Sequence, residues 1–247
     1  MKFYVYCLSD GLSGASAEGL TGVGGAPVRL VEVGGAASVF GVVAVLSEFA
    51  GERVPLTREN LLAHNRVNAH VLARVTPLPF RFGTLADGER LSAYVAANET
   101  ALAEGFALVR GCVEMGVKVR LDEGAKAGVE PPAVNVEAVN DGAAGVGRGT
   151  AFLLAKRREI MGGEALKARA EEAAARVAAC VGGVARAADV RLSPEGPIVV
   201  RASHLVARED VEEYRARARE LGAGLAGMHV LASGPWPPYS FSLFSPV

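Results

Sequence analysis

The chain has 247 residues, half of them hydrophobic, and a formal net charge of −1. This length can bury the core of one large domain or of two smaller ones. Because Lys and Arg alternate with Asp and Glu along the predicted helices, the charge pattern argues against nucleic acid or an anionic membrane as a partner.

Three cysteines, Cys7, Cys112 and Cys180, lie far apart and form no CxxC pair. They therefore predict neither a zinc knuckle nor a disulfide framework, and we expect reduced thiols that pack as small apolar side chains. The N-terminus begins directly with a strand pattern and lacks the features of a signal peptide. No apolar run reaches the ~20 residues of a membrane span. We expect a cytoplasmic protein.

The first half of the chain mixes strand and helix patterns. Residues 3–8, 28–33 and 39–46 are predicted strands, and Gly34-Gly35 between the last two favours a hairpin. Thr57 can cap a helix that runs to about residue 75, with Leu61, Leu72 and Val75 on one side.

Two prolines and a second helix follow. Pro77 and Pro79 exclude residues 78–82 from a central ladder, so this stretch is an edge strand or an extended connector. Asp87 can cap a helix in which apolar residues recur at helical spacing until Gly111 ends it.

The second half begins with the clearest strand signal. Val113, Met115, Val117, Val119 and Leu121 alternate with polar residues over 113–121. Residues 122–149 predict a long loop with one extended piece at 134–139. The remaining predicted elements are a helix over 150–180 that can break at 162–163, strands at 184–192 and 198–206, a helix over 208–221, and a strand at 225–232.

This order of strand, helix, strand, strand, helix, strand predicts a ferredoxin-like domain, an antiparallel sheet with helices on one face. We therefore expect an α+β protein of two domains, residues 1–110 and 111–247. The second domain ends in an extended tail over 234–247 that is rich in proline and aromatic residues.

A search for chemistry finds no phosphate loop, nucleophile elbow or metalloprotease motif. Glycines at 145, 147 and 149 could present backbone N–H groups to an anion, or simply end a linker. His64 and His70 lie six positions apart on one helix, and one strand separates His204 from His229, so each is expected to be structural. No carboxylate pair is placed for acid–base work, and we predict no catalytic, cofactor or metal site.

Four segments carry a resemblance to a known family. They are residues 4–6 (YVY), residues 61–65 (LLAHN) leading into 77–84 (PLPFRFGT), residues 111–119 (GCVEMGVKV) and the tail at 234–241 (GPWPPYSF). In this order, over essentially the whole chain, they resemble the gas vesicle protein F/L family (GvpF/GvpL). The resemblance implies a non-enzymatic accessory protein that acts in gas vesicle assembly or is a minor structural component. It also implies two α+β domains, the second a modified ferredoxin-like one.

Candidate interaction residues come from the tail and from two surfaces. Prolines at 235, 237 and 238 stiffen the tail, so Trp236, Tyr239 and Phe241 can anchor it either on a partner or across the two domains of its own chain. The first surface is the polar face of the C-terminal sheet, with Glu114, Lys118 and Arg120. The second lies near Arg81 and Phe82, where Arg81 either forms a buried ion pair, with Glu48 as a candidate, or makes a surface contact.

The resemblance implies the vesicle shell protein and other accessory proteins as partners, in association with gas vesicles. The alternative hypothesis is a ligand-binding or catalytic α+β protein, because ferredoxin-like sheets also hold small-molecule sites. That alternative requires a deep pocket between the domains with titratable groups of perturbed pKa.

Overall fold

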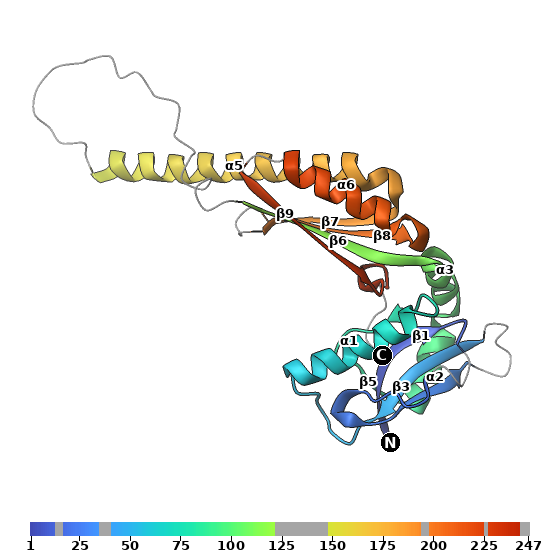
Figure 1. Ribbon diagram of the computed structural model, residues 1–247. Helices are drawn as coiled ribbons and strands as arrows, with labels where there is room; N and C mark the ends of the chain where they lie inside the picture. The colour runs from blue at the N-terminus through green and yellow to red at the C-terminus, as the bar shows by residue number, and fades with distance from the viewer. Residues whose placement is uncertain (13–16, 35–40, 122–147, 194–197, 225–226, 243–247) are drawn as a thin grey trace, which may run out of the picture.

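The computed structural model describes residues 1–12, 17–34, 41–121, 148–193, 198–224 and 227–242, with no account of the side chains of 121 and 148–162. Two antiparallel sheets organise the chain, one in each half (Figure 1). This confirms the predicted α+β class.

The N-terminal sheet has the order β2-β3-β1-β4, with β5 also paired to β1. Its strands are β1 (Lys2–Ser9), β2 (Val28–Val33), β3 (Val42–Glu48), β4 (Leu78–Pro79) and β5 (Leu85–Asp87). The two-proline stretch supplies the short edge strand β4, one of the two alternatives that the sequence left open, because proline cannot donate to a central ladder.

Helices cover both faces of this sheet. Helix α1 (Arg58–Leu72) begins at Thr57, whose side chain accepts a hydrogen bond from the backbone N–H of Asn60. It packs on the face that carries Tyr4 and Tyr6. Helices α2 (Gly88–Ala97) and α3 (Glu99–Val109) pack on the face that carries Val5.

Two details of these helices differ from the sequence prediction. Of the residues predicted to share one side of α1, Leu72 is buried but Leu61 is 37% exposed, and Ala63, Val67 and Val71 pack against the sheet. The single helix predicted after Asp87 is divided at Asn98, whose amide donates to the carbonyl of Tyr94 at 2.8 Å. Asparagine side chains compete with helical backbone in this way.

The C-terminal sheet has the order β7-β8-β6-β9, and all its neighbours are antiparallel. This is the strand order of a ferredoxin-like sheet. Its elements are β6 (Cys112–Leu121), α5 (Arg148–Val181), β7 (Ala185–Leu192), β8 (Ile198–Ala207), α6 (Val211–Gly224) and β9 (Met228–Trp236).

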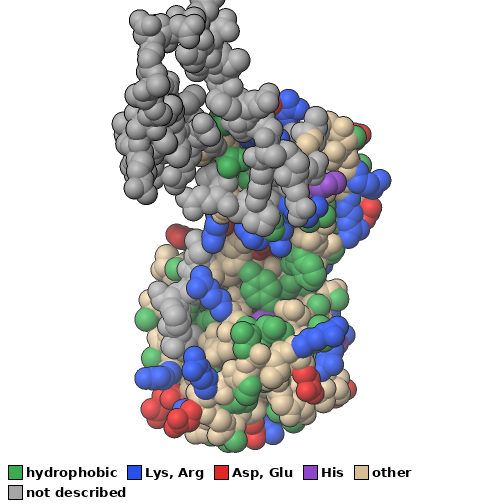
Figure 2. Space-filling model, turned by 90° about the vertical axis from the view of Figure 1, so that its left-hand side faces the viewer, with side chains coloured by type: hydrophobic (Ala, Val, Ile, Leu, Met, Phe, Trp, Pro, Cys, Tyr) green, Lys and Arg blue, Asp and Glu red, His purple; other side chains and the backbone are tan. Residues whose placement is uncertain are grey.

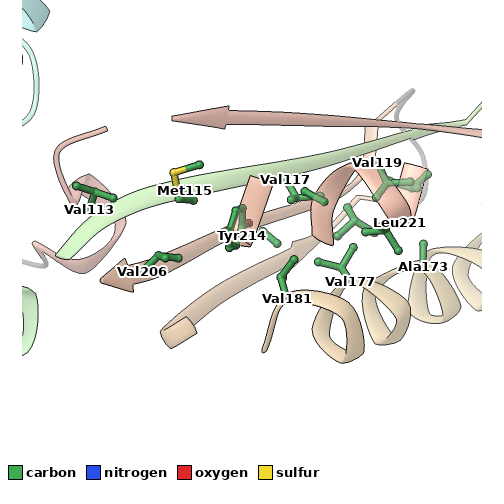
Figure 3. Close-up of a cluster of buried hydrophobic side chains, with 14 of the residues drawn as sticks. Val113, Met115, Val117, Val119, Ala173, Val177, Val181, Val206, Tyr214 and Leu221 are labelled. Atoms are coloured by element: carbon green, nitrogen blue, oxygen red, sulfur yellow. The ribbon is translucent and has the colours of Figure 1, made fainter. Parts of the chain in front are cut away.

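Both helices cover one face of this sheet, above it in Figure 1. Val113, Met115, Val117 and Val119 point from β6 into a core shared with α5 and α6, where Tyr214 is fully buried (Figure 3). The other face points toward the N-terminal half. The alternation in the 113–121 segment therefore predicted correctly which residues of β6 form the core.

In this half one open alternative is decided and one boundary was predicted wrongly. The helix that could break at 162–163 continues as α5 through Gly162-Gly163. Strand β9 continues to Trp236, so the first part of the expected tail is a strand paired with β6, with Trp236 opposite Glu114. The possible extended piece at 134–139 and the glycines at 145 and 147 lie outside the described residues.

Candidate interaction surface

The open face of the C-terminal sheet carries the polar residues of β6. Lys118 and Arg120 are exposed, in agreement with the alternation of the strand. Glu114 is only 8% exposed, although it lies on the same face. The expectation that all three residues form a solvent-accessible polar surface is therefore wrong for Glu114.

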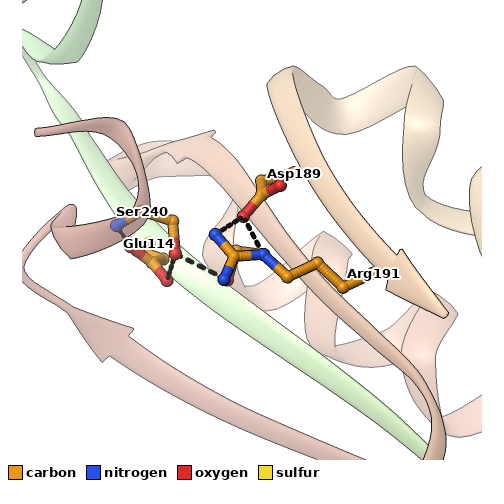
Figure 4. Close-up of polar contacts among 5 residues, drawn as sticks. Glu114, Asp189, Arg191 and Ser240 are labelled. Atoms are coloured by element: carbon orange, nitrogen blue, oxygen red, sulfur yellow. Dashed lines mark hydrogen bonds and ion pairs between the residues drawn. The ribbon is translucent and has the colours of Figure 1, made fainter. Parts of the chain in front are cut away.

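The tail is what covers Glu114. The backbone N–H of Ser240 donates to Glu114 Oε2 at 2.8 Å, and its hydroxyl donates to Oε1 at 2.7 Å (Figure 4). The hydroxyl of Ser240 also lies 3.0 Å from that of Ser203 on β8. Both carboxylate oxygens of Glu114 are thus occupied, and charge-assisted bonds of this kind are stronger than neutral ones.

One residue earlier, the tail contacts the N-terminal half. The hydroxyl of Tyr239 lies 3.0 Å from Nε2 of His64 and 3.1 Å from the amide nitrogen of Asn68, both on α1. Two residues later, Phe241 packs against the core beneath α2 and α3. Residues 239–241 therefore contact both halves of the chain.

Both ring nitrogens of His64 have hydrogen-bond partners. Nδ1 lies 2.8 Å from the hydroxyl of Tyr4, which also accepts the backbone N–H of Gly83 at 3.2 Å. Nε2 lies 3.0 Å from the hydroxyl of Tyr239 and 3.1 Å from the amide nitrogen of Asn68. His64 acts as a neutral link between β1 and the tail.

Burial governs the titration of this network. Desolvation lowers the pKa of His64 to about 4 and raises the pKa of Tyr4 and of Tyr239 above the ordinary tyrosine value. His64 is 2% exposed, and its ring nitrogens are bonded to protein groups. It is placed as a structural histidine. The histidine on β8, His204, is likewise buried and bonded to the hydroxyl of Tyr214 at 2.8 Å.

Trp236 differs from the other aromatic residues of the tail. Its side chain is 50% exposed at the end of β9, whereas Tyr239 and Phe241 are partly buried against the rest of the chain. The guanidinium of Arg215, on α6, donates to the carbonyl of Gly234 at 3.1 Å and holds this end of the strand. Trp236 is the tail aromatic that is free to meet another molecule.

The surface near Arg81 is separate from the sheet. Arg81 is exposed, while Phe82 packs edge-on against Tyr4 and His64 at ring distances of 6.1 and 5.8 Å. Of the two alternatives for Arg81, the buried ion pair is excluded by this exposure, and the carboxylate of Glu48 pairs instead with Arg29 at 2.9 Å. Phe82 also lines a groove of about 620 Å³ together with the exposed Leu56.

Metal and membrane features can be assessed for the described part of the chain. It holds no group of three His, Cys, Asp or Glu side chains placed to bind a metal ion. His204 on β8 and His229 on β9 are separated by β6, as predicted. Among the described helices, none is both long and apolar enough to cross a membrane.

The sequence and the fold both match proteins of gas vesicles. The sequence pattern described as "Gas vesicle synthesis protein GvpL/GvpF" matches residues 2–242. The chain belongs to the GvpL/GvpF family.

Gas vesicle proteins named L and gas vesicle proteins named F are both similar to this GvpL/GvpF-family chain. Gas vesicle protein L of Streptomyces sp. (strain CB03234) is 29% identical over 97% of the chain and 92% of the relative, and gas vesicle protein F of the same organism is 28% identical over 98% and 99%. The crystal structure of gas vesicle protein GvpF from Anabaena sp. PCC7120 has the same fold, with a TM-score of 0.76 and 17% identity over 99% of each chain. These names are of gas vesicle proteins and not of enzymes, which confirms the prediction of a non-enzymatic protein.

Sequence reasoning missed one feature of this GvpL/GvpF-family chain. Arg191 on β7 and Arg201 on β8 lie on the same open face as Lys118 and line a groove of about 260 Å³ with it. Figure 2 shows Lys and Arg side chains in a band across the middle of the view, with hydrophobic side chains below them. The alternation of β7 and β8 could have placed each arginine on this face, but the register that aligns them could not be read from one sequence.

Proposed function

We propose that this GvpL/GvpF-family protein acts in the assembly of gas vesicles, or as a minor structural component, by contacting the shell protein and other accessory proteins. The observation that carries the proposal is the open face of the C-terminal sheet, where Lys118 and Arg120 stay exposed. Helices α5 and α6 both pack on the opposite face of this sheet.

The tail supports the choice of this face. Tyr239 and Ser240 hydrogen-bond to groups of the same chain, so they are occupied on the free protein. On the open face, Lys118 and Arg120 remain exposed to a partner, and Trp236 is 50% exposed. Tryptophan and arginine are the residue types that most often dominate the energy of protein interfaces.

Deletion of the gene tests the assembly role. We expect loss of gas vesicles while the shell protein is still synthesised, and recovery when the wild-type chain is supplied. The wild-type chain should also capture the shell protein or another accessory protein in a pull-down experiment. Vesicles that form normally in the deletion strain would overturn the proposal.

Charge reversal tests the face. Lys118→Glu with Arg120→Glu should weaken capture of the partner without unfolding, because both side chains are exposed and surface substitutions change stability little. The matched control is Lys167→Glu with Arg219→Glu on the helices of the opposite side, which changes the net charge equally. Equal capture by the two variants would exclude this face.

A further inference from the structure

Three cations from three neighbouring strands lie opposite one another on the open face. Lys118 on β6 is the register partner of Arg201 on β8, and Arg201 is the register partner of Arg191 on β7. Residues in such positions have Cβ atoms about 4.5–5.5 Å apart, and like charges there destabilise a sheet. All three residues are exposed. We call Arg191, Arg201 and Lys118 the cationic row.

The row is only partly neutralised by its own chain. Asp189 accepts from Nε and Nη2 of Arg191 at 3.1 and 2.9 Å (Figure 4). Glu114, the other acidic residue that lines the groove, has both oxygens bonded to Ser240. Over the described ranges no ion pair joins Lys118 or Arg201 to a carboxylate.

Apolar side chains lie next to the row on the same face, on β9, which pairs with β6 along the edge away from β8. Trp236 lines the same groove as the row and is 50% exposed. Leu231 is the register partner of Lys118 on β9 and is 54% exposed. The open face therefore presents positive charge over β7, β8 and β6, and apolar side chains along β9.

We propose that this groove binds an acidic segment of a partner protein, with its carboxylates on the cationic row and an apolar side chain against Trp236 and Leu231. Adjacent strands are about 4.8 Å apart, so the row spans about 10 Å, a length that a few residues of a peptide can follow. Arginine presents a planar fork of donors that fits a carboxylate. This inference rests on the proposed function, since it states the chemistry of the partner that the open face would take.

Charge and composition favour a protein segment over a polyphosphate. The net charge of the chain is −1, which offers no general attraction for nucleic acid or anionic lipid. The adjoining Trp236 and Leu231 instead suit an apolar side chain.

Binding of a defined probe tests the groove. The probe is a short fluorescein-labelled peptide of Glu and Ser with one Leu, measured by fluorescence anisotropy on the full chain. We expect the peptide to bind at about 0.01 M ionic strength and to be released toward about 1 M, as the Debye length falls from about 30 to about 3 Å. Peptides with Gln or Lys in place of Glu should bind at least about tenfold more weakly.

Charge reversal on the protein should reverse this preference. Lys118→Glu with Arg201→Glu should bind the Glu peptide at least about tenfold more weakly and should gain affinity for the Lys peptide. The Lys167→Glu, Arg219→Glu control should keep the wild-type preference, and thermal melts should show that all variants are folded. Unchanged binding in the reversed variant, or preferential binding of an oligonucleotide or of phosphatidylserine vesicles, would overturn the proposal.

The outcomes separate this inference from the proposed function. If the deletion strain forms normal vesicles, the assembly role fails, whatever the peptide binds. If the chain is needed for vesicles but the Lys118→Glu, Arg201→Glu variant retains the Glu peptide, the acidic-segment inference fails alone.

Discussion

At the scale of single residues, His64 shows how a local feature depends on distant parts of the chain. Its position on a helix and its structural role could be predicted from sequence. Its partners could not, because Tyr4 and Tyr239 lie 60 and 175 positions away. The same limit explains Glu114, whose strand was predicted but whose cover, Ser240, lies 126 positions away.

Acid should weaken the folded state through His64. The ordinary histidine pKa is about 6.5, and burial lowers the pKa of His64 to about 4. The unfolded chain therefore binds more protons between these values, so the free energy of unfolding is at its full value above about pH 6.5 and falls toward pH 4. A shift of this size corresponds to ~3 kcal/mol at most.

Urea unfolding of the wild type and of His64→Gln, followed from neutral pH to about pH 4.5, checks this prediction. The variant should lose less stability on acidification than the wild type. His204, whose pKa burial also lowers, remains in both proteins and contributes equally to both. Identical losses in the two proteins would show that His64 is not buried neutral against Tyr4 and Tyr239.

At the scale of elements, local signals predicted most helices and strands. Thr57 and Asp87 cap α1 and α2 through their side chains, as their residue types indicated. The elements that differed were decided by other interactions: the amide of Asn98 divides α2 from α3, and pairing with β6 extends β9 through Pro235. Neither effect has a periodic signature in the sequence.

The continuity of α5 leads to a stability prediction. Gly163 lies inside the helix, and an added Cβ would meet no atom within 4 Å. Gly163→Ala should raise the free energy of unfolding by about 0.5–1 kcal/mol, because alanine loses less backbone entropy on entering a helix. Thermal or urea unfolding measures the change.

Gly234 is the matched control, since there the same substitution should be destabilising. Its φ is +114°, and an added Cβ would lie 2.8 Å from the carbonyl oxygen of Glu114. Gly234→Ala should therefore lower the midpoint that Gly163→Ala raises. A lower midpoint in Gly163→Ala would indicate that α5 is not helical across the glycine pair.

At the scale of the whole molecule, residues of each half complete the core of the other. Cys112 and Leu205 from the C-terminal sheet are buried in the core beneath α2 and α3, while Leu72 of α1 belongs to the core beneath α5 and α6. The guanidinium of Arg208 donates to the carbonyl of Leu72 at 2.6 Å, and Thr76 donates to the carbonyl of Cys112 at 2.8 Å. The expected domain boundary between residues 110 and 111 stays a prediction, and these contacts cross it.

Shared cores predict that the two halves unfold together. The full chain should show one cooperative transition, with fluorescence of Trp236 and far-UV circular dichroism giving the same midpoint. Separated fragments 1–110 and 111–247 should each unfold at a lower urea concentration than the full chain, because fragment 1–110 lacks Leu205 and the tail that bonds His64. Mixing the fragments should restore part of the lost stability if the same contacts re-form. Fragments as stable as the full chain, or two separate transitions in it, would show that the contacts across the boundary contribute little to the free energy of unfolding.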